Sequence, residues 1–288
     1  MRRHRLAFIA LLLGFAAGPV RAQPPIWIVH GPHATVVLFG SVHLLPAGLQ
    51  WEPQRLRLAL TKASDVWFEI PMDPAAGQEA GQAALSRGVL PAGETLDTAL
   101  SPATRLRLAA AAAKLGMPVE GLQRLRPWLA DISLSLAAYR MQGALQQDGV
   151  ERRLSAQLPK TVERKAFETP AEQIEALAAT PPADQVASLE ETLADLEQGD
   201  DAYGKLVKAW MAGDVQALRR EALDPLMTSA PGAYRILVAD RNHRWMDAVR
   251  GRLAGHGVAV MVVGVGHLVG PDGLPILLRA DGYAVDGP

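Results

Sequence analysis

Two similar segments near opposite ends of this chain of 288 residues constrain its fold most strongly. In each, a run of apolar, mostly β-branched residues leads to a glycine, and a histidine follows three positions later. The first is residues 36–39 with Gly40 and His43, and the second is residues 260–263 with Gly264 and His267. Such runs predict buried strands, and glycine allows a sharp exit from each. Because side chains just beyond the carboxyl ends of strands in an open α/β sheet face the ligand crevice, we expect both histidines at one site.

The rest of the pattern predicts an α/β (α+β) fold with one mixed sheet. Residues 26–29 and 35–39 are typical of a hairpin, and residues 65–70, 258–263 and 283–285 have the composition of further strands. Residues 161–167 alternate enough to form another strand, although a continued helix would fit them nearly as well. Helical patterns dominate from about residue 75 to about residue 250. No linker rich in Pro, Ser and Gly divides the chain, so we expect a single domain over residues 23–288 with a helical insertion at about 75–250.

The first 22 residues have the order of a secretory signal peptide. Three arginines lie within the first five residues, an apolar run covers residues 6–17, and Val20, Arg21 and Ala22 follow a Gly-Pro break. The apolar run is shorter than the ~20 residues that a membrane-spanning helix needs. We therefore expect cleavage after Ala22, a periplasmic or secreted location, and no membrane span after cleavage.

Composition excludes several classes of function. The chain has no cysteine, which rules out Cys-ligated zinc and cysteine nucleophiles. Lys+Arg 29 balance Asp+Glu 30, and without a basic surplus we expect no nucleic-acid partner. The helical zinc-protease motif and the serine-hydrolase elbow are both missing from the sequence.

Glu69 is the third chemical group that the predicted strands bring to the two histidines. It lies near the end of the strand predicted at residues 65–70, and a buried carboxylate there needs a partner. Two imidazoles and a carboxylate form a ligand set for a divalent ion such as Zn, Mn or Co. The alternative is a structural ion pair between Glu69 and an arginine such as Arg241. The other histidines, His30, His33, His243 and His256, are expected at the solvated surface.

Several ordered motifs resemble the TraB/GumN family, which is related to the Tiki metalloproteases. They are residues 39–46 around His43, residues 68–70 around Glu69, residues 126–128, residues 167–169 around Glu168, Arg241 with Asn242 and Trp245, and residues 263–274 around His267. The resemblance spans most of the mature chain. It implies one α/β domain with a helical insertion, a divalent-metal site built from the paired histidines and a glutamate, and proteolysis in the Tiki branch. The chain departs from the family in having Gly149-Val150-Glu151 where members often have Gly-x-Asp.

The resemblance leads us to expect an exported metal-dependent hydrolase, with peptidase activity on a peptide or protein substrate. His43, His267 and Glu69 are the expected ligands of one divalent metal ion, Mn, Co or Zn. Glu69 or Glu168 would take a proton from the metal-bound water, and Arg241 would steady the developing oxyanion or a substrate carboxylate. The alternative is a non-catalytic cell-envelope binding protein that holds a peptide or glycan in the same crevice.

Overall fold

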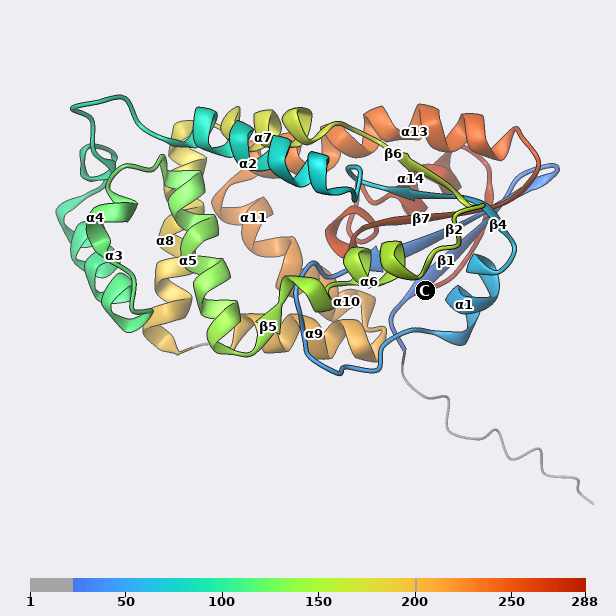
Figure 1. Ribbon diagram of the computed structural model, residues 1–288, viewed down its shortest axis with the longest axis horizontal. Coiled ribbons are helices and arrows are strands. Elements are labelled where there is room, and N and C mark those ends of the chain that lie inside the picture. Colours follow the sequence, from blue (N-terminus) through green and yellow to red (C-terminus); the bar gives the residue numbers. More distant parts are fainter. Residues whose placement is uncertain (1–22, 200) are drawn as a thin grey trace, which may run out of the picture.

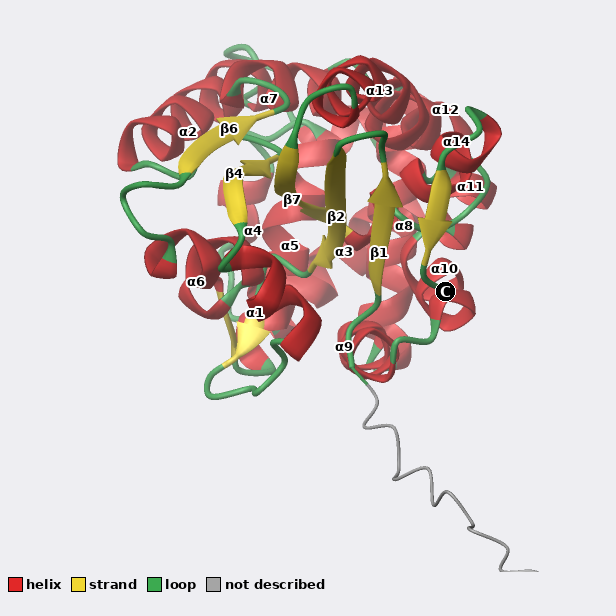
Figure 2. Cartoon of the chain, turned by 90° about the vertical axis from the view of Figure 1, so that its right-hand side faces the viewer, coloured by secondary structure: helices red, strands yellow, loops and turns green. Residues whose placement is uncertain are grey.

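The computed structural model describes residues 23–199 and 201–288, and a six-stranded sheet forms its centre. The expected signal peptide, residues 1–22, lies outside the described residues. The strand order is β6-β4-β7-β2-β1-β8. The strands are β1 (Ile26–His30), β2 (Ala34–Ser41), β4 (Ala63–Phe68), β6 (Glu163–Ala166), β7 (Gly257–Gly264) and β8 (Ala284–Asp286). Figure 2 shows them side by side.

Strands β6, β4, β7 and β2 run parallel, and β1 pairs with β2 and β8 in antiparallel fashion. The sheet is therefore mixed, as predicted. In the β2–β7 pair Gly40 lies opposite Val263, and Ser41 lies opposite Gly264. The two strand-glycine-histidine segments are thus neighbours in the sheet, although they come from opposite ends of the sequence.

The central strands are buried on both faces. Residues 259–263 of β7 have no exposed surface, and Leu38 and Phe39 of β2 are likewise fully buried. Continuous apolar runs of this kind are typical of parallel strands covered by helices on both sides. Helices α1 (Gln54–Leu60) and α13 (Asp240–Leu253) pack against these strands, and Figure 1 shows α13 above them and α1 below.

A second apolar core lies outside the sheet, among the helices of the predicted insertion. Leu108, Leu134 and Leu189 are fully buried in it, on α3, α5 and α8. Figure 1 shows these helices gathered at the end of the molecule away from the sheet. The helices from α2 to α8 are α2 (Pro74–Gly88), α3 (Pro102–Lys114), α4 (Val119–Leu122), α5 (Pro127–Met141), α6 (Val150–Gln157), α7 (Pro170–Ala178) and α8 (Pro182–Gln198).

The chain returns from this helical layer to the sheet through a further series of helices. These are α9 (Ala202–Ala212), α10 (Val215–Ala222), α11 (Asp224–Ser229), α12 (Pro231–Tyr234), a π-helical stretch η3 (Arg235–Ala239) that leads into α13, and α14 (Leu274–Ala280) near the C-terminus. Short 3₁₀ turns occur at η1 (Leu96–Ala99), η2 (Gln146–Asp148) and η4 (Val265–His267). A small separate sheet pairs β3 (Leu45–Pro46) with β5 (Ala144–Leu145).

The structure refines two expectations and adds two features that the sequence did not predict. The predicted strand at 161–167 is β6, and it joins the main sheet beside β4, so a sheet strand interrupts the helices of the insertion. Strand β4 ends at Phe68, which makes Glu69 the first residue beyond it rather than a residue within it. The sequence pattern did not predict the π-helical stretch or the β3–β5 pair. Within the described residues, no helix has both the length and the apolar character needed to cross a membrane.

Candidate active site

Four predicted side chains meet at the carboxyl edge of the sheet. His43 follows β2, Glu69 follows β4, Glu168 follows β6, and His267 ends the turn after β7. The β4–β6 pairing continues past the strands, since the Glu168 N–H donates to the Glu69 carbonyl at 3.0 Å. This extension places the two glutamates next to each other. Arg241 enters from the first turn of α13.

Gly264 marks the point on which these groups converge. A methyl group at its α-carbon would lie 3.1 Å from Glu69 Oε1 and 3.8 Å from both His43 Nε2 and His267 Cδ2. Its own N–H donates to Glu69 Oε1 at 2.6 Å. The absence of a side chain at this position therefore lets a carboxylate and two imidazoles approach one another.

Glu69 is fully engaged by its neighbours. Besides the Gly264 N–H, it accepts from Arg241 Nη2 at 2.6 Å and from Gln173 Nε2 at 2.9 Å, both on Oε2. Burial alone would raise the pKa of this carboxyl. The charges of Arg241 and His43, together with the Gly264 N–H, outweigh burial and lower the pKa of Glu69 to about 2. The Glu69–Arg241 ion pair that the sequence left as an alternative is therefore formed.

The guanidinium of Arg241 uses every N–H that it carries. Nε donates to Glu168 Oε2 at 3.1 Å, Nη2 donates to Glu69 and to Glu168 Oε1, and Nη1 donates to the Leu237 carbonyl and to His267 Nε2, both at 3.0 Å. A guanidinium has five N–H groups, so none is left for a substrate in this arrangement. The Leu237 carbonyl belongs to the π-helical stretch, a feature frequent at functional sites.

His267 is held as a neutral imidazole. Because a guanidinium can only donate, His267 Nε2 is the acceptor of its bond to Arg241, and the proton resides on Nδ1. Nδ1 lies 2.7 Å from Asn242 Oδ1, and Asn242 Nδ2 donates in turn to the His267 carbonyl at 3.1 Å. Burial, above all, lowers the pKa of His267 to about 3. This histidine is 6% exposed and has no free ring nitrogen.

His43 has the opposite character. Its side chain is 61% exposed, and Nδ1 lies 2.6 Å from Oε1 of Glu151, a buried carboxylate on α6. The Ser41 hydroxyl donates to the same oxygen at 2.6 Å. The Glu151 carboxylate raises the pKa of His43 to about 9, so the ring is protonated at neutral pH. His43 Nε2 makes no hydrogen bond with any residue that the structure describes, and the His43 side chain lines a large cavity.

Close backbone packing brings Glu151 to His43. Gly149 caps the start of α6, and a methyl group at its α-carbon would lie 1.9 Å from the His43 carbonyl oxygen. The Val150 N–H donates to the Val42 carbonyl at 3.2 Å. Only glycine permits this approach, and the close packing at Gly149 places the Glu151 carboxylate within hydrogen-bond distance of His43. The glutamate in place of the family's aspartate reaches His43 from here.

Sequence reasoning missed part of the site. The sequence marks Glu151 only as a departure from the family motif and does not predict its contact with His43. Ser41 belongs to no catalytic motif. Asn242 and Gln173 were not candidates. Gly149, two residues before Glu151, is the sequence feature that could have indicated Glu151 as a site residue. For Asn242 the indication is its place beside Arg241 at the start of a helix.

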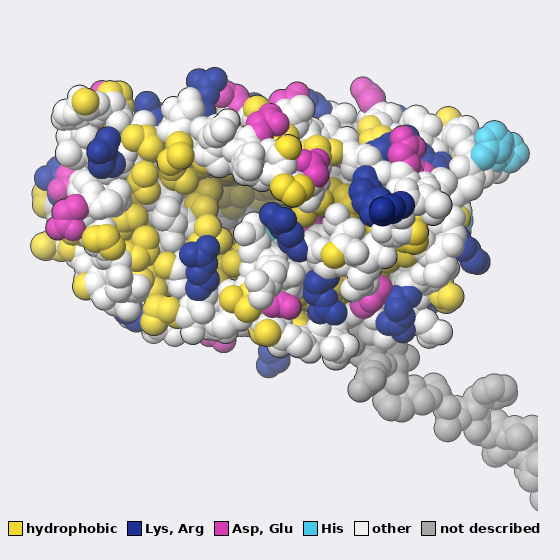
Figure 3. All heavy atoms as spheres, in the orientation of Figure 1, with side chains coloured by type: hydrophobic (Ala, Val, Ile, Leu, Met, Phe, Trp, Pro, Cys, Tyr) yellow, Lys and Arg dark blue, Asp and Glu magenta, His cyan; other side chains and the backbone are white. Residues whose placement is uncertain are grey.

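A cavity of about 520 Å³ opens above this cluster. Its polar side includes His43, Glu69, Arg241 and His267. The opposite side is apolar and comes from the helical layer, with Ile132, Tyr139, Leu177, Leu206, Leu226 and Leu237. Figure 3 shows a hollow on one face of the molecule where hydrophobic side chains gather between the helical end and the sheet. The size suits a ligand of several hundred daltons.

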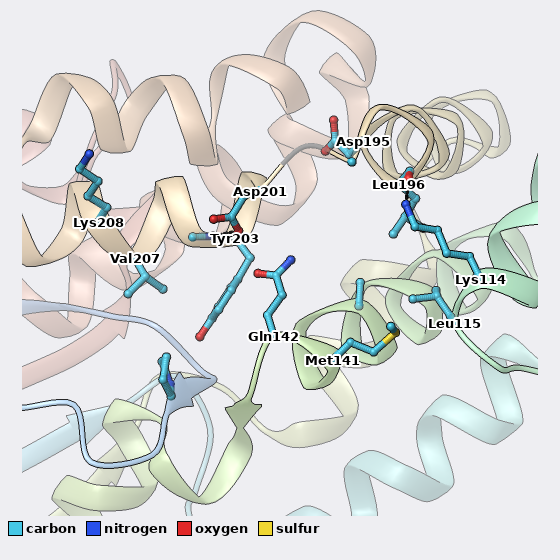
Figure 4. A pocket seen from close by; sticks show the side chains of 14 residues that line it. Lys114, Leu115, Met141, Gln142, Asp195, Leu196, Asp201, Tyr203, Val207 and Lys208 are labelled. Carbon is cyan, nitrogen blue, oxygen red and sulfur yellow. Dashed lines mark hydrogen bonds between the residues drawn. The ribbon is translucent and has the colours of Figure 1, made fainter.

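A second cavity, of about 690 Å³, lies between the ends of α3, α5, α8 and the start of α9 (Figure 4). Two of its charged side chains bind helix ends: Lys114 donates to the Leu196 carbonyl, and Asp201 caps α9 by accepting from the Gly204 N–H at 2.8 Å. Neither predicted site histidine lines it. This cavity is larger than the one at the sheet edge but holds none of the groups expected to carry chemistry.

The predicted metal ligands do not fit a metal ion in this arrangement. Glu69 and Glu168 direct their oxygens at Arg241, and His267 Nε2 accepts from the same guanidinium. His43 Nε2 is the one ring nitrogen of the pair that stays open. Across residues 23–199 and 201–288, no group of three or more His, Cys, Asp or Glu side chains is arranged to hold a metal. Metal binding at His43, His267 and Glu69 therefore stays a prediction that the contacts do not support.

The remaining histidines among the described residues lie away from the crevice. His30 Nε2 lies 2.9 Å from Asp286 Oδ2, where β1 pairs with β8. The rings of His33 and His256 stack with centroids 5.3 Å apart. None of these histidines lines the sheet-edge cavity.

The comparisons with known proteins point to one family. The sequence has no significant match among curated proteins or among solved structures. Residues 25–287 match the profile of the TraB/PrgY/gumN family, so the match covers nearly all of the chain. The geometry agrees with the motifs that suggested it, since the segments around His43, Glu69, Glu168, Arg241 and His267 meet at one edge of the sheet. The chain belongs to the TraB/PrgY/gumN family.

Proposed function

We propose that this protein is a hydrolase that cleaves a peptide or protein substrate in the crevice at the carboxyl ends of its strands. The observation that carries the proposal is the exposed imidazole of His43, whose Nδ1 is held by Glu151 at 2.6 Å and whose Nε2 borders the cavity. A carboxylate on one ring nitrogen fixes the orientation of the ring, and once the ring is neutral the other nitrogen can accept a proton.

In the proposed reaction the neutral form of His43, which predominates above its pKa of about 9, takes a proton on Nε2 from a water molecule in the crevice, so we expect cleavage to increase as the pH rises toward 9. The water oxygen forms a bond to the substrate carbonyl carbon, and the carbon–nitrogen bond then breaks. The proton moves from Nε2 to the departing amine, so the imidazole returns to its starting state. Glu151 accepts the Nδ1 hydrogen bond throughout and stabilises the imidazolium that forms between the two transfers.

This assignment moves the role of base away from the carboxylates that the sequence favoured. Glu69 is a weak base because its pKa is lowered to about 2, and both of its oxygens already accept hydrogen bonds. Glu168 is bonded to Arg241 through both oxygens. Arg241 has no N–H left for an oxyanion. Within the described residues, His43 is the group that combines access to the crevice with an available ring nitrogen.

The apolar side of the crevice supports a peptide as the substrate. Leucine and isoleucine side chains from the helical layer face the polar side of the same cavity. Such a wall suits apolar side chains of a peptide better than the hydroxyl-rich surface of a glycan. The rival proposal, a non-catalytic binding protein of the cell envelope, uses the same wall without the transfer of a proton.

We also propose that the protein works outside the cytoplasm, on the strength of the charged and apolar order of residues 1–22. Mass spectrometry of the protein from the cell envelope or the medium should find Gln23 at its N-terminus. Recovery of the chain with Met1 intact in the cytoplasm would remove the proposed location.

The test of hydrolysis compares the wild-type chain with two histidine variants on a mixed peptide library read by mass spectrometry. His43→Ala should reduce cleavage by ~10²–10⁴-fold, the usual contribution of general-base catalysis. His256→Ala, a histidine that does not line the crevice, should leave cleavage unchanged. Peptides that bind the wild type but are never cut would favour the binding protein. Equal cleavage by His43→Ala and wild type would remove His43 as the base.

A further inference from the structure

Arg241 is the most densely bonded side chain of the site. It is 6% exposed, all of its N–H groups have acceptors, and its guanidinium carbon lies 4.7 Å from the centroid of the Trp245 ring. Three of its acceptors are side chains: Glu69, Glu168 and His267. Two carboxylates and an imidazole are also the groups with which proteins bind divalent metals.

The same lone pairs cannot serve a guanidinium and a metal ion together. His267 Nε2 has a single lone pair, and it accepts from Arg241 Nη1 at 3.0 Å. A divalent ion placed between Glu69 and His267 would also lie within a few ångströms of the guanidinium, where like charges repel strongly in a buried site. The side chain of Arg241 would have to leave before these residues could bind a metal.

We propose that Arg241 is the resident cation of this site and positions Glu69, Glu168 and His267 in place of a metal ion. The wild-type site then excludes divalent metals, and removal of the guanidinium converts its three partners into a metal site. The inference concerns metal binding and positioning, so it holds or fails independently of the proposed hydrolysis.

The first measurement is metal binding by the wild-type chain. Zn²⁺, Mn²⁺ and Co²⁺ are titrated in turn by calorimetry, and metal content after dialysis is measured by elemental analysis. We expect no saturable binding of one ion per chain, and no change in melting temperature on addition of metal. One tightly bound ion per chain that is lost in His267→Ala would overturn the proposal.

The second measurement uses Arg241→Ala, which leaves two buried carboxylates without their counter-charge. This variant should melt well below the wild type, and Zn²⁺ or Mn²⁺ should restore its stability. A metal at a hundredfold excess over its Kd should raise the melting temperature by roughly 5–10 °C. The double variant Arg241→Ala/His267→Ala should lose most of this gain, because one of three ligands is gone. Failure of Arg241→Ala to bind any of the three metals would overturn the proposal.

Arg252→Ala is the matched control. Arg252 pairs with Asp65 at 3.0 Å, and the two side chains are 10% and 5% exposed, so this ion pair is buried much like that of Arg241. It has one carboxylate and no histidine among its side-chain acceptors. Its removal should lower the melting temperature with no recovery on addition of metal. Equal recovery in both variants would show that metal acts on the fold in general, and would overturn the assignment.

If Arg241→Ala does not fold, Arg241→Gln replaces it. Glutamine fills part of the volume and keeps two N–H groups, but it removes the positive charge. The direct readout is then the ¹⁵N spectrum of His267, which should show the proton on Nδ1 in the wild type and a changed Nε2 signal in the variant. A spectrum that is the same in both would show that Arg241 does not position this imidazole.

Discussion

Replacement of Glu151 by glutamine isolates the contact on which the proposed catalysis depends. Glutamine keeps the shape of the side chain and removes its charge. In the wild type the carboxylate accepts from both Ser41 Oγ and His43 Nδ1 at 2.6 Å. In Glu151→Gln the side-chain oxygen can still accept both bonds, but the electrostatic attraction to an imidazolium is lost.

The magnitude follows from the effect of Glu151 on the pKa of His43. The carboxylate raises this pKa from 6.5 to about 9, and that difference corresponds to about 3 kcal/mol. Because the His43 side chain is 61% exposed, solvent screening reduces the figure to about 1–2 kcal/mol. A group with a raised pKa in the fold stabilises it below pH 6.5, and this contribution is lost as the pH rises through about 9. The fold lowers the pKa of Glu151, so the contribution of its ionised carboxylate to stability is present above the ordinary glutamate pKa of 4.5 and is lost at lower pH.

We therefore expect Glu151→Gln to unfold about 1–2 kcal/mol more easily than the wild type between pH 5 and 7, with a smaller difference above pH 9. Nuclear magnetic resonance titration of His43 should show its pKa fall from about 9 toward 6.5. At pH 10, where the ring is neutral in both proteins, the rate of peptide cleavage should fall at least ~10-fold because the imidazolium that forms during the reaction loses its carboxylate partner. Glu79→Gln, an exposed change on α2, serves as the control. A His43 pKa near 6.5 in the wild type, or one unmoved in the variant, would refute the reasoning.

Three further substitutions test other contacts. In Gly264→Ala the backbone conformation (φ −49, ψ 136) is one that alanine also adopts, so we expect a stable fold. The added methyl group would lie 3.1 Å from Glu69 Oε1 and 3.8 Å from His43 Nε2, and we expect it to reduce cleavage about 100-fold. Gly149→Ala would place a methyl group 1.9 Å from the His43 carbonyl, and denaturant titration should show a loss of about 1–3 kcal/mol. Burial raises the pKa of Asp131 to about 6, so its protonated form stabilises the fold below pH 3.8 and this contribution is lost as the pH rises through about 6. Asp131→Asn should therefore be up to about 2 kcal/mol more stable than the wild type at pH 8 and equal to it at pH 3.5, and equal stabilities at pH 8 would contradict this.

Much of the framework could be predicted from local patterns. The hairpin, the strand near residue 163, the strand of β7 and most helix positions follow from apolar runs, capping residues and prolines, all of which act within a few residues. Ser101 with Pro102, for example, both predicts and begins α3. The repeated motif also predicted that the ends of β2 and β7 lie at one site, whereas it did not predict that the two strands are direct neighbours.

The partners of the site residues could not be predicted in the same way. Glu151 reaches His43 across more than a hundred residues of chain, and the contact depends on how closely two backbone segments pack at Gly149. Arg241 was a candidate, but one sequence position cannot show how many acceptors surround it. Four of its five bonds go to Glu69, Glu168 and His267, on three segments that meet Arg241 only in the folded chain, and these bonds decide whether Glu69 is free to bind a metal.

The two histidines, alike in sequence, differ because their loops differ. Gly40 lies within β2, and residues 45–46 beyond His43 are extended in β3, so the imidazole stays at the rim of the crevice. Gly264 ends β7, and the 3₁₀ turn Val265–His267 folds the second imidazole beneath the edge of the sheet toward α13. There it meets Arg241 and Asn242, which occupy both ring nitrogens. The repeated motif therefore does not produce two equivalent ligands. It produces one exposed imidazole with a carboxylate behind it, suited to proton transfer, and one buried neutral imidazole that belongs to the hydrogen-bond network of a guanidinium.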